Sequence, residues 1–285
     1  MRTGIMLAKR FTGEKNLKSW HKPWIVQPKL DGLRCRAVRT ENGSTFLVSS
    51  EGNPITTVPH ILSDLHKLDA PIELDGELYI HGEFQKLCSI VKRNSLHSDY
   101  KLVSYQVFDC IDVDCEIPQS DRLQLLYAIF KDQHLASVRL VDSWRASSIE
   151  GNQQVLDYCL SHGYEGIIMR EPFAPYSRSR VGTILKLKTA KEDVFPIVGT
   201  KEEISIHGEP KSALGAVICE ESGEKFSVGT GPLLTRVNRD LLWNLQADLV
   251  GKFALVKFQN LTTRGVPRFP VLMGIANTPE EARNV

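Results

Sequence analysis

The sequence predicts an α+β fold in two domains: a larger one that mixes short strands with amphipathic helices, and a smaller one built mainly of strands. Three observations lead to this prediction. The chain has 285 residues, which at ~150 residues per domain corresponds to two domains. Its 42% hydrophobic and 24% charged residues are typical of a globular protein and exclude intrinsic disorder. The hydrophobic pattern also changes near residue 190.

The first domain is expected to cover residues 1–190. Apolar residues recur at helical spacing in four segments, 58–68, 83–92, 120–134 and 148–162. The last of these is followed by Gly163, a residue typical of a helix end. Alternation typical of strands occurs between the helices, in segments 24–28, 33–39, 44–49, 72–80, 101–109, 165–170 and 182–188.

The second domain is expected to cover residues 191–285. Short strand-like runs separated by Gly and Pro fill 194–230 and 252–276. One amphipathic helix is expected near 235–247, with an apolar side formed by Val237, Leu241, Leu242 and Leu245. Strands surrounding a single helix over about 95 residues favour a small closed barrel of the OB type.

The net charge of +1 hides an uneven distribution along the chain. Residues 1–39 contain ten Lys and Arg against two acids, and the segments 173–191 and 249–279 contain basic residues but no acid. These stretches are compatible with a positive surface that binds phosphates, and equally with ordinary solvated faces.

The six cysteines include no C-x-x-C pair, so reduced thiols in the cytosol are expected. No window approaches the ~18 apolar residues of a membrane span, and the N-terminal apolar stretch is too short for a signal peptide. We therefore expect a cytoplasmic protein that has no membrane partner.

The sharpest local feature is a predicted strand that ends in a lysine and a turn: Lys29-Leu30-Asp31-Gly32-Leu33-Arg34. In the strand that follows, Arg34 and Arg36 share a face because side chains alternate. This places an amine and a guanidinium at one edge of a sheet. The alternative is an ordinary hairpin turn with a solvated lysine.

Two further strands carry charges in close succession. Glu73, Asp75 and Glu77 share a face and repel one another unless cations or donors lie among them, the alternative being an exposed acidic edge. Lys186 and Lys188 also share a face, where a phosphate chain would relieve their repulsion, the alternative being a solvated face.

Two single residues also stand at strand ends. Glu165 begins an apolar strand and could offer an oxygen ligand to Mg²⁺, or it is a surface residue. Phe108 closes a buried-looking strand, where core packing is the ordinary role.

In order and spacing these motifs resemble those of the covalent nucleotidyltransferases, especially the short ATP-dependent DNA ligases of bacteriophage and minimal bacterial type. The matching motifs are Lys29-x-Asp31-Gly32-x-Arg34, Asp75-Gly76-Glu77, Phe108-Asp109, Glu165-Gly166 and Lys186-x-Lys188. Met6–Lys9 resembles the family's entry strand, and Leu261–Pro270 resembles the ending of its OB domain. The resemblance covers about residues 5–276 and implies a nucleotidyltransferase (adenylation) domain of antiparallel sheets with flanking helices, followed by an OB-fold β-barrel.

The resemblance also implies a chemistry. Lys29 would take AMP from ATP, pass it to the 5′-phosphate of a nick in duplex DNA, and the 3′-OH would then displace AMP. A lysine amine must lose its proton before it can attack, and neighbouring cations favour that loss. Lys186, Lys188, Arg34 and a bound Mg²⁺ or other divalent cation would be those neighbours. A monomer acting in the cytoplasm is expected, and a virus-encoded enzyme in its host would fit as well.

The remaining roles follow from the same resemblance. Gln27 would read the base edge, Phe108 would stack on adenine, and Arg34, Lys186 and Lys188 would contact the phosphates. Glu165 and Glu77 would bind metal, with Glu77 also reaching the ribose. Contacts with the DNA backbone, sensitive to salt and independent of sequence, are expected from Arg36, Lys92, Arg93, Arg178, Arg180, Arg264 and Arg268.

Two motifs depart from the family pattern. Ser50 stands where an arginine is usual, so Arg36 or Arg39 would have to replace it. The segment 271–274 lacks the usual basic element that assists ATP activation, and Lys252, Lys257 or Arg268 would have to substitute. An RNA ligase with the same lysine chemistry and a non-catalytic nucleic-acid-binding relative remain alternatives. A capping guanylyltransferase is disfavoured by the same missing element.

Overall fold

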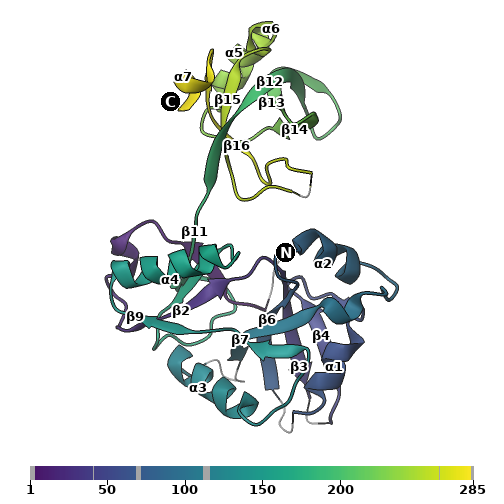
Figure 1. The fold of residues 1–285 in the computed structure, drawn as a ribbon, viewed down its shortest axis with the longest axis vertical. Coiled ribbons are helices and arrows are strands. Elements are labelled where there is room, and N and C mark those ends of the chain that lie inside the picture. Colours follow the sequence, from purple (N-terminus) through teal and green to yellow (C-terminus); the bar gives the residue numbers. More distant parts are fainter. Residues whose placement is uncertain (1–3, 41, 69–71, 112–115, 263, 284–285) are drawn as a thin grey trace. The chain divides into compact units, whose positions relative to one another are not determined.

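The computed structural model describes residues 4–40, 42–68, 72–111, 116–262 and 264–283 (Figure 1). The chain divides into two compact units, Met1–Lys188 and Thr189–Val285. Each unit has its own hydrophobic core. None of the helices in the described ranges is long and apolar enough to cross a membrane.

A six-stranded sheet forms one half of the first unit, in the order β5-β4-β3-β6-β7-β8. All neighbours are antiparallel except β7 and β8. The strands are β3 (Leu33–Arg39), β4 (Thr45–Ser49), β5 (Pro54–Ile55), β6 (Ile72–Tyr79), β7 (Ser104–Ile111) and β8 (Val138–Leu140). The helices that pack on this sheet are α1 (Pro59–Leu65), α2 (Phe84–Val91) and α3 (Gln119–Phe130) (Figure 1). Leu74 and Leu78 point into the core beneath them, so the alternating acids of β6 lie on the opposite face.

A five-stranded sheet forms the other half, in the order β1-β11-β10-β2-β9. Only β1 and β11 are parallel neighbours. The strands are β1 (Leu7–Arg10), β2 (Trp24–Lys29), β9 (Trp144–Ala146), β10 (Gly166–Arg170) and β11 (Arg180–Lys188). Helix α4 (Ile149–Ser161) packs on the face that buries Trp24, Val26 and Leu185. Because side chains alternate, Gln27, Lys29 and Lys186 belong to the face away from α4.

Local sequence explains the limits of α4. The Ser148 side chain accepts a hydrogen bond from the Gly151 N–H at 3.1 Å and so caps the first turn. At the other end Gly163 has φ +78°, which glycine adopts without strain. The region 101–109 begins as a strand later than expected, because η2 (Tyr100–Leu102) is a 3₁₀ turn, as is η1 (Glu14–Leu17).

The second unit contains a five-stranded antiparallel sheet in the order β14-β13-β12-β15-β16. The strands are β12 (Lys191–Ile204), β13 (Pro210–Glu221), β14 (Glu224–Val228), β15 (Phe253–Phe258) and β16 (Val271–Ala276), and the helices are α5 (Arg236–Asn244), α6 (Gln246–Leu249) and α7 (Pro279–Arg283). The expected closed barrel is corrected here. No strand pairing among the described residues joins β14 to β16. One backbone hydrogen bond, from Leu272 N–H of β16 to Thr230 O at 2.7 Å, joins β16 to the segment that follows β14.

The expected single helix near 235–247 is also corrected. It is divided into α5 and α6, and Val237, Leu241 and Leu245 are exposed rather than buried. Leu242 packs against the core, beside Trp243. The Arg239 guanidinium lies on the inner side of α5, where it donates to four backbone carbonyls of neighbouring segments, Leu214, Gly215, Gly229 and Leu234. A half-buried cation thus occupies part of the position that periodicity alone assigns to apolar side chains.

Candidate active site

Lys29 ends β2 beside β10, and its side chain meets a carboxylate from the start of β10. Lys29 Nζ donates to Glu165 Oε2 in a short hydrogen bond, and Lys188 Nζ donates to Glu165 Oε1 at 2.9 Å. The Glu165 N–H also donates to Lys29 O at 3.0 Å, which ties the two backbones together. The Glu165 side chain is 4% exposed and that of Lys29 is 21% exposed. The amine is therefore held at the site entrance by a buried carboxylate.

Glycine at position 166 is needed for this arrangement. Gly166 has φ +152°, and a Cβ there would lie 2.2 Å from Leu187 O of β11. Only glycine lets β10 approach β11 so closely. The close approach brings Glu165 between Lys29 on one neighbouring strand and Lys188 on the other.

The charges around Lys29 are predominantly positive. Burial raises the pKa of the Glu165 carboxyl, but the Lys29 and Lys188 ammonium groups outweigh this and hold it below its usual value. The pKa of Lys186 is lowered by burial and then by repulsion from Lys29 and Lys188. Two lysines bind one buried carboxylate and a third lysine lies near enough to be repelled by them, so this surface favours an incoming anion such as a phosphate.

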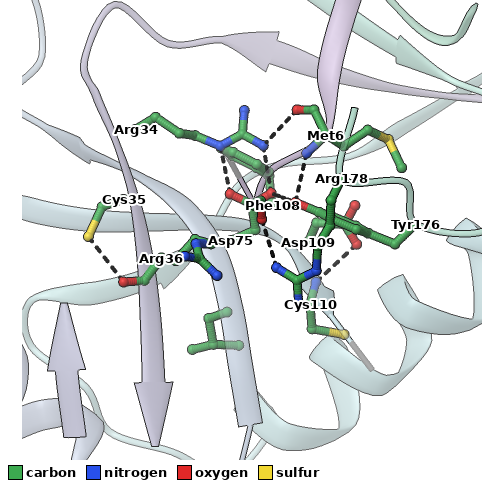
Figure 2. A network of polar contacts seen from close by, with 12 residues as sticks. Met6, Arg34, Cys35, Arg36, Asp75, Phe108, Asp109, Cys110, Tyr176 and Arg178 are labelled. Atoms are coloured by element: carbon green, nitrogen blue, oxygen red, sulfur yellow. Dashed lines mark hydrogen bonds and ion pairs between the residues drawn. The ribbon is translucent and has the colours of Figure 1, made fainter. Parts of the chain in front are cut away.

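Arginines bind the Asp75 and Glu73 carboxylates of β6, so the repulsion expected from the spacing of these acids is reduced. Asp75 is fully buried and accepts from Arg34 Nε at 2.6 Å, Arg34 Nη2 at 2.5 Å and the Tyr176 hydroxyl at 2.5 Å (Figure 2). Glu73 accepts from Arg36 Nη1 at 2.5 Å and from Arg178 Nη2 at 2.9 Å. These carboxylates therefore position arginines rather than forming an acidic edge.

Glu77 is the exception among these acids, because burial raises the pKa of its carboxyl to about 7 against the pull of Arg34 and Lys29. Below about pH 4.5 the Glu77 carboxyl is protonated in both the folded and the unfolded chain, so its burial does not reduce the free energy of unfolding there. As pH rises to about 7 the carboxyl ionises mainly in the unfolded chain, and the free energy of unfolding therefore falls.

We expect Glu77→Gln to remove this pH dependence, so that the variant loses about 3 kcal/mol less stability than the parent between pH 4.5 and 8. Urea denaturation of both proteins across that range measures the difference. Identical slopes of unfolding free energy against pH would contradict the assignment.

The inner end of the site is a buried polar network beneath Phe108. Asp109 is fully buried and accepts from Arg122 Nε at 2.8 Å and from Arg170 Nη1 at 3.1 Å. The Arg34 guanidinium carbon lies 4.5 Å from the Phe108 ring centroid, and that of Arg170 lies 5.2 Å from it. Phe108 is 9% exposed, and two guanidinium groups lie against its ring.

Gln27 is 1% exposed and joins this network. It bonds to Arg170 and to the backbone of Phe108. The structure thus gathers Gln27, Lys29, Arg34, Glu77, Phe108, Glu165, Lys186 and Lys188 between the two sheets of the first unit, through the contacts and charge interactions given above.

The residues expected to contact DNA have different partners in each unit. Arg36 and Arg178 meet at Glu73, whereas Arg180 donates to Ala8 O at 2.7 Å on β1. Lys92 and Arg93 follow α2 and are exposed. In the second unit Arg264 pairs with Glu224 at 3.3 Å and Arg268 lies 5.0 Å from the Phe269 ring centroid.

Three residues of the site were not anticipated from sequence: Arg122, Arg170 and Tyr176. Arg170 and Tyr176 lie near motifs but carry no spacing signal of their own, while Arg122 reads as part of an amphipathic helix. An arginine within an otherwise apolar strand or helix face was the available signal, because a buried guanidinium needs a carboxylate partner.

No group of three or more His, Cys, Asp or Glu side chains suited to a metal ion occurs in the part of the chain that the structure describes. The carboxyl groups of Glu77 and Glu165 nevertheless both interact with Lys29. Mg²⁺ is commonly held by one or two protein carboxylates together with substrate phosphates. The donor set fits a cation that arrives with a phosphate ligand.

Comparison with known proteins now identifies the family. A model described as the ATP-dependent DNA ligase domain matches residues 5–188, more than half of the chain. The chain belongs to the ATP-dependent DNA ligase family. A second model, the DNA ligase OB-like domain, matches residues 207–275. The resemblance predicted from the motifs and the two-part fold class are confirmed.

Curated relatives of this ligase-family chain agree. It is 28% identical over 262 residues to the DNA ligase of African swine fever virus (strain Badajoz 1971 Vero-adapted), covering 85% of this chain and 61% of the relative. It is 26% identical over 247 residues to the DNA ligase of Haemophilus influenzae, covering 86% of this chain and 84% of that relative. The chain therefore spans about three fifths of the length of the viral relatives.

Solved structures show the same fold. A structure from work on Lig E DNA ligases, described as DNA binding with a minimal scaffold, has a TM-score of 0.76 at 22% identity, covering 96% of this chain and 99% of that one. The Chlorella virus DNA ligase-adenylate has a TM-score of 0.54 at 25% identity, covering 97% and 99%. The arrangement of elements in the ligase family is thus shared along nearly the whole chain.

Proposed function

We propose that this chain is an ATP-dependent DNA ligase that seals nicks between a 3′-OH and a 5′-phosphate through a lysyl-AMP and a DNA-adenylate. The observation that supports this best is the sharing of Glu165 by Lys29 and Lys188, with Lys186 beside them. One surface then combines an amine nucleophile, cations for phosphate and a carboxylate that orients the amine.

In the proposed first step, Lys29 Nζ gives up a proton to solvent water and attacks the α-phosphorus of ATP. A P–N bond forms, and the P–O bond to pyrophosphate breaks, so pyrophosphate leaves with its electron pair. Lys186 and Lys188 stabilise the charge on the phosphoryl oxygens. Glu165 already accepts a hydrogen bond from Nζ, so it keeps the amine aimed at the entrance.

The next steps move AMP to DNA. The 5′-phosphate of the nick attacks the adenylyl phosphorus and releases the Lys29 amine. The 3′-OH then attacks the 5′-phosphorus, forms the phosphodiester bond and expels AMP. Each step exchanges one bond to phosphorus for another, so the same cations serve all three.

The spacing along β2 supports nucleotide binding in this orientation. Gln27 and Lys29 share a face and are about 7 Å apart along the strand. A nucleoside monophosphate bound alongside β2 would place its base near Gln27 and Phe108 and its phosphate at Lys29. Glu77, on the neighbouring sheet, would face the ribose. Arg34 would reach the phosphate through Nη1, since Asp75 holds its Nε and Nη2.

Glu165 and Glu77 are the proposed ligands of Mg²⁺ or another divalent cation. When bound, such a cation offsets negative charge on the phosphates of the substrate. Two lysines fix the position of the Glu165 carboxylate. Burial raises the pKa of the Glu77 carboxyl to about 7.

Nicked duplex DNA is the proposed substrate, bound by a monomer in the cytoplasm. The proposed backbone contacts are Arg36, Lys92, Arg93, Arg178, Arg180, Arg264 and Arg268. We place the nucleotidyltransferase domain at residues 1–190 and the OB-fold domain at 191–285. Arg36 and Arg178, which both bind Glu73, are the proposed replacement for the arginine that the family usually has at the position of Ser50.

A nick-sealing assay tests this function. We expect the purified chain, with ATP and Mg²⁺, to join a labelled nicked DNA duplex, and to join it at least about tenfold faster than matched duplexes with ribose on both sides of the nick. Joining of only the ribose substrates would favour the RNA ligase alternative. Binding of the duplex with no joining of any substrate would favour a non-catalytic relative.

A further inference from the structure

The amide of Gln27 has only one orientation available to it. Arg170 Nε donates to Gln27 Oε1 at 2.7 Å. Gln27 Nε2 donates to Phe108 O at 3.3 Å and to Ser143 Oγ at 3.0 Å. A guanidinium only donates and a backbone carbonyl only accepts. The oxygen of the amide must therefore face Arg170, and its nitrogen must face Phe108 O.

Arg170 is itself held by groups below the site. Its side chain is 3% exposed, and Nη1 donates to Asp109 Oδ2 and Gln119 Oε1, both at 3.1 Å. Asp109 is held in turn by Arg122. The orientation of Gln27 thus depends on a buried network linked to the site through Arg170.

In this orientation the Gln27 side chain can accept one more hydrogen bond, at Oε1. Both hydrogens of Nε2 have acceptors, whereas Oε1 can accept two hydrogen bonds and receives one from Arg170 among the described residues. A base edge that reaches Gln27 therefore meets an acceptor. Adenine presents an amine at position 6, and guanine presents an oxygen there.

We propose that Arg170 is a positioning residue that makes Gln27 selective for a 6-aminopurine over a 6-oxopurine. This inference rests on the proposed function, because it assumes that the base lies at Gln27 and Phe108. With Arg170 present, a 6-oxo group faces the Gln27 oxygen and is repelled. Without Arg170, the amide can turn and donate to that group instead.

The test compares ATP with inosine triphosphate, which has an oxygen at position 6. For wild type and variants we would measure the dissociation constant of each nucleotide by equilibrium dialysis, and the rate of label transfer to protein from each. Wild type is expected to prefer ATP by about 10–100-fold. Arg170→Met is expected to reduce the preference at least about tenfold, and Arg170→Lys to restore part of it.

Arg122→Lys is the matched control. Arg122 shares Asp109 and Gln119 with Arg170, whereas the guanidinium that donates to Gln27 Oε1 is that of Arg170, so the variant should lose stability and keep the wild-type preference. A folded Arg170→Met that keeps the full preference for ATP would overturn the proposal. If that variant does not fold, Gln27→Met replaces it: loss of the preference supports the proposal, and its retention overturns it.

The two readouts separate this inference from the proposed function. Nucleotide binding with the predicted preference but no label on the protein would count against lysine adenylation and would support the Gln27 assignment. Labelling from ATP and inosine triphosphate with equal efficiency in wild type would count against the Gln27 assignment and leave adenylation standing.

Discussion

Glu165→Gln is expected to slow the attachment of AMP to the protein by at least about 100-fold. The change removes the charge that Lys29 and Lys188 share, and an amide cannot accept from both amines through two anionic oxygens. Losing one preorganised charged group in such a site costs about 10²–10³ in rate. Single-turnover labelling with α-labelled ATP, without DNA, measures the effect.

Glu203→Gln is the control for this prediction. Glu203 is also a carboxylate shared by two cations, but it lies on β12 of the second unit and its partners are Lys211 and Arg236. Labelling by Glu203→Gln should stay within about threefold of wild type, since a paired carboxylate outside the reacting groups adds little to the rate. Labelling at the wild-type rate by Glu165→Gln would show that the shared carboxylate has no part in the step.

Asp109→Asn is expected to lower the free energy of unfolding by about 3–5 kcal/mol. Asp109 and Arg122 are 0% exposed, and Arg170 is 3% exposed. The substitution leaves two buried guanidinium groups without their counter-charge, and desolvation of each is then uncompensated. Urea denaturation monitored by tryptophan fluorescence measures the loss.

An exposed pair provides the comparison. Glu83 is 54% exposed and lies 3.6 Å from Lys86 on the surface of the same unit. Exposed pairs contribute about 0–1 kcal/mol, so Glu83→Gln should change stability by no more than that. An Asp109→Asn variant as stable as Glu83→Gln would mean that the buried network does not support the fold.

Periodicity in the sequence was sufficient to predict which face each motif occupies. Lys186 and Lys188 alternate with Leu185 and Leu187, so a shared face for the two lysines followed from strand geometry alone. The helix ending at Gly163 and the strand ending at Lys29 were predictable for similar local reasons. Local spacing was therefore enough to find most elements of the first unit.

Partners far apart in sequence could not be predicted in this way. Lys29 and Glu165 are 136 residues apart, and Gln27 and Arg170 are 143 apart. Periodicity assigns each side chain to a face but does not say which strands become neighbours. Glu165 was consequently expected as a metal ligand alone, and its role between two lysines appeared only once β2, β10 and β11 were placed side by side.

Arg34 illustrates the same limit within a motif. The family resemblance implied a phosphate contact for Arg34, yet Asp75 holds two of its nitrogens and Tyr176 also donates to that carboxylate. In the second unit, the apolar residues of α5 suggested a buried side, but the inner position is taken by Arg239. Hydrogen bonds from an arginine to groups elsewhere in the chain decide both cases: Arg34 donates to the Asp75 carboxylate, and Arg239 donates to backbone carbonyls.

The central claim is that the amine of Lys29 takes up AMP. The direct measurement is incubation with α-labelled ATP and Mg²⁺, denaturation, and peptide mapping of the label. We expect label on the peptide that contains Lys29 and none on the Lys29→Arg variant. A wild-type protein that stays unlabelled while ATP binds, or label that persists in Lys29→Arg and maps to Lys186 or Lys188, would contradict the account.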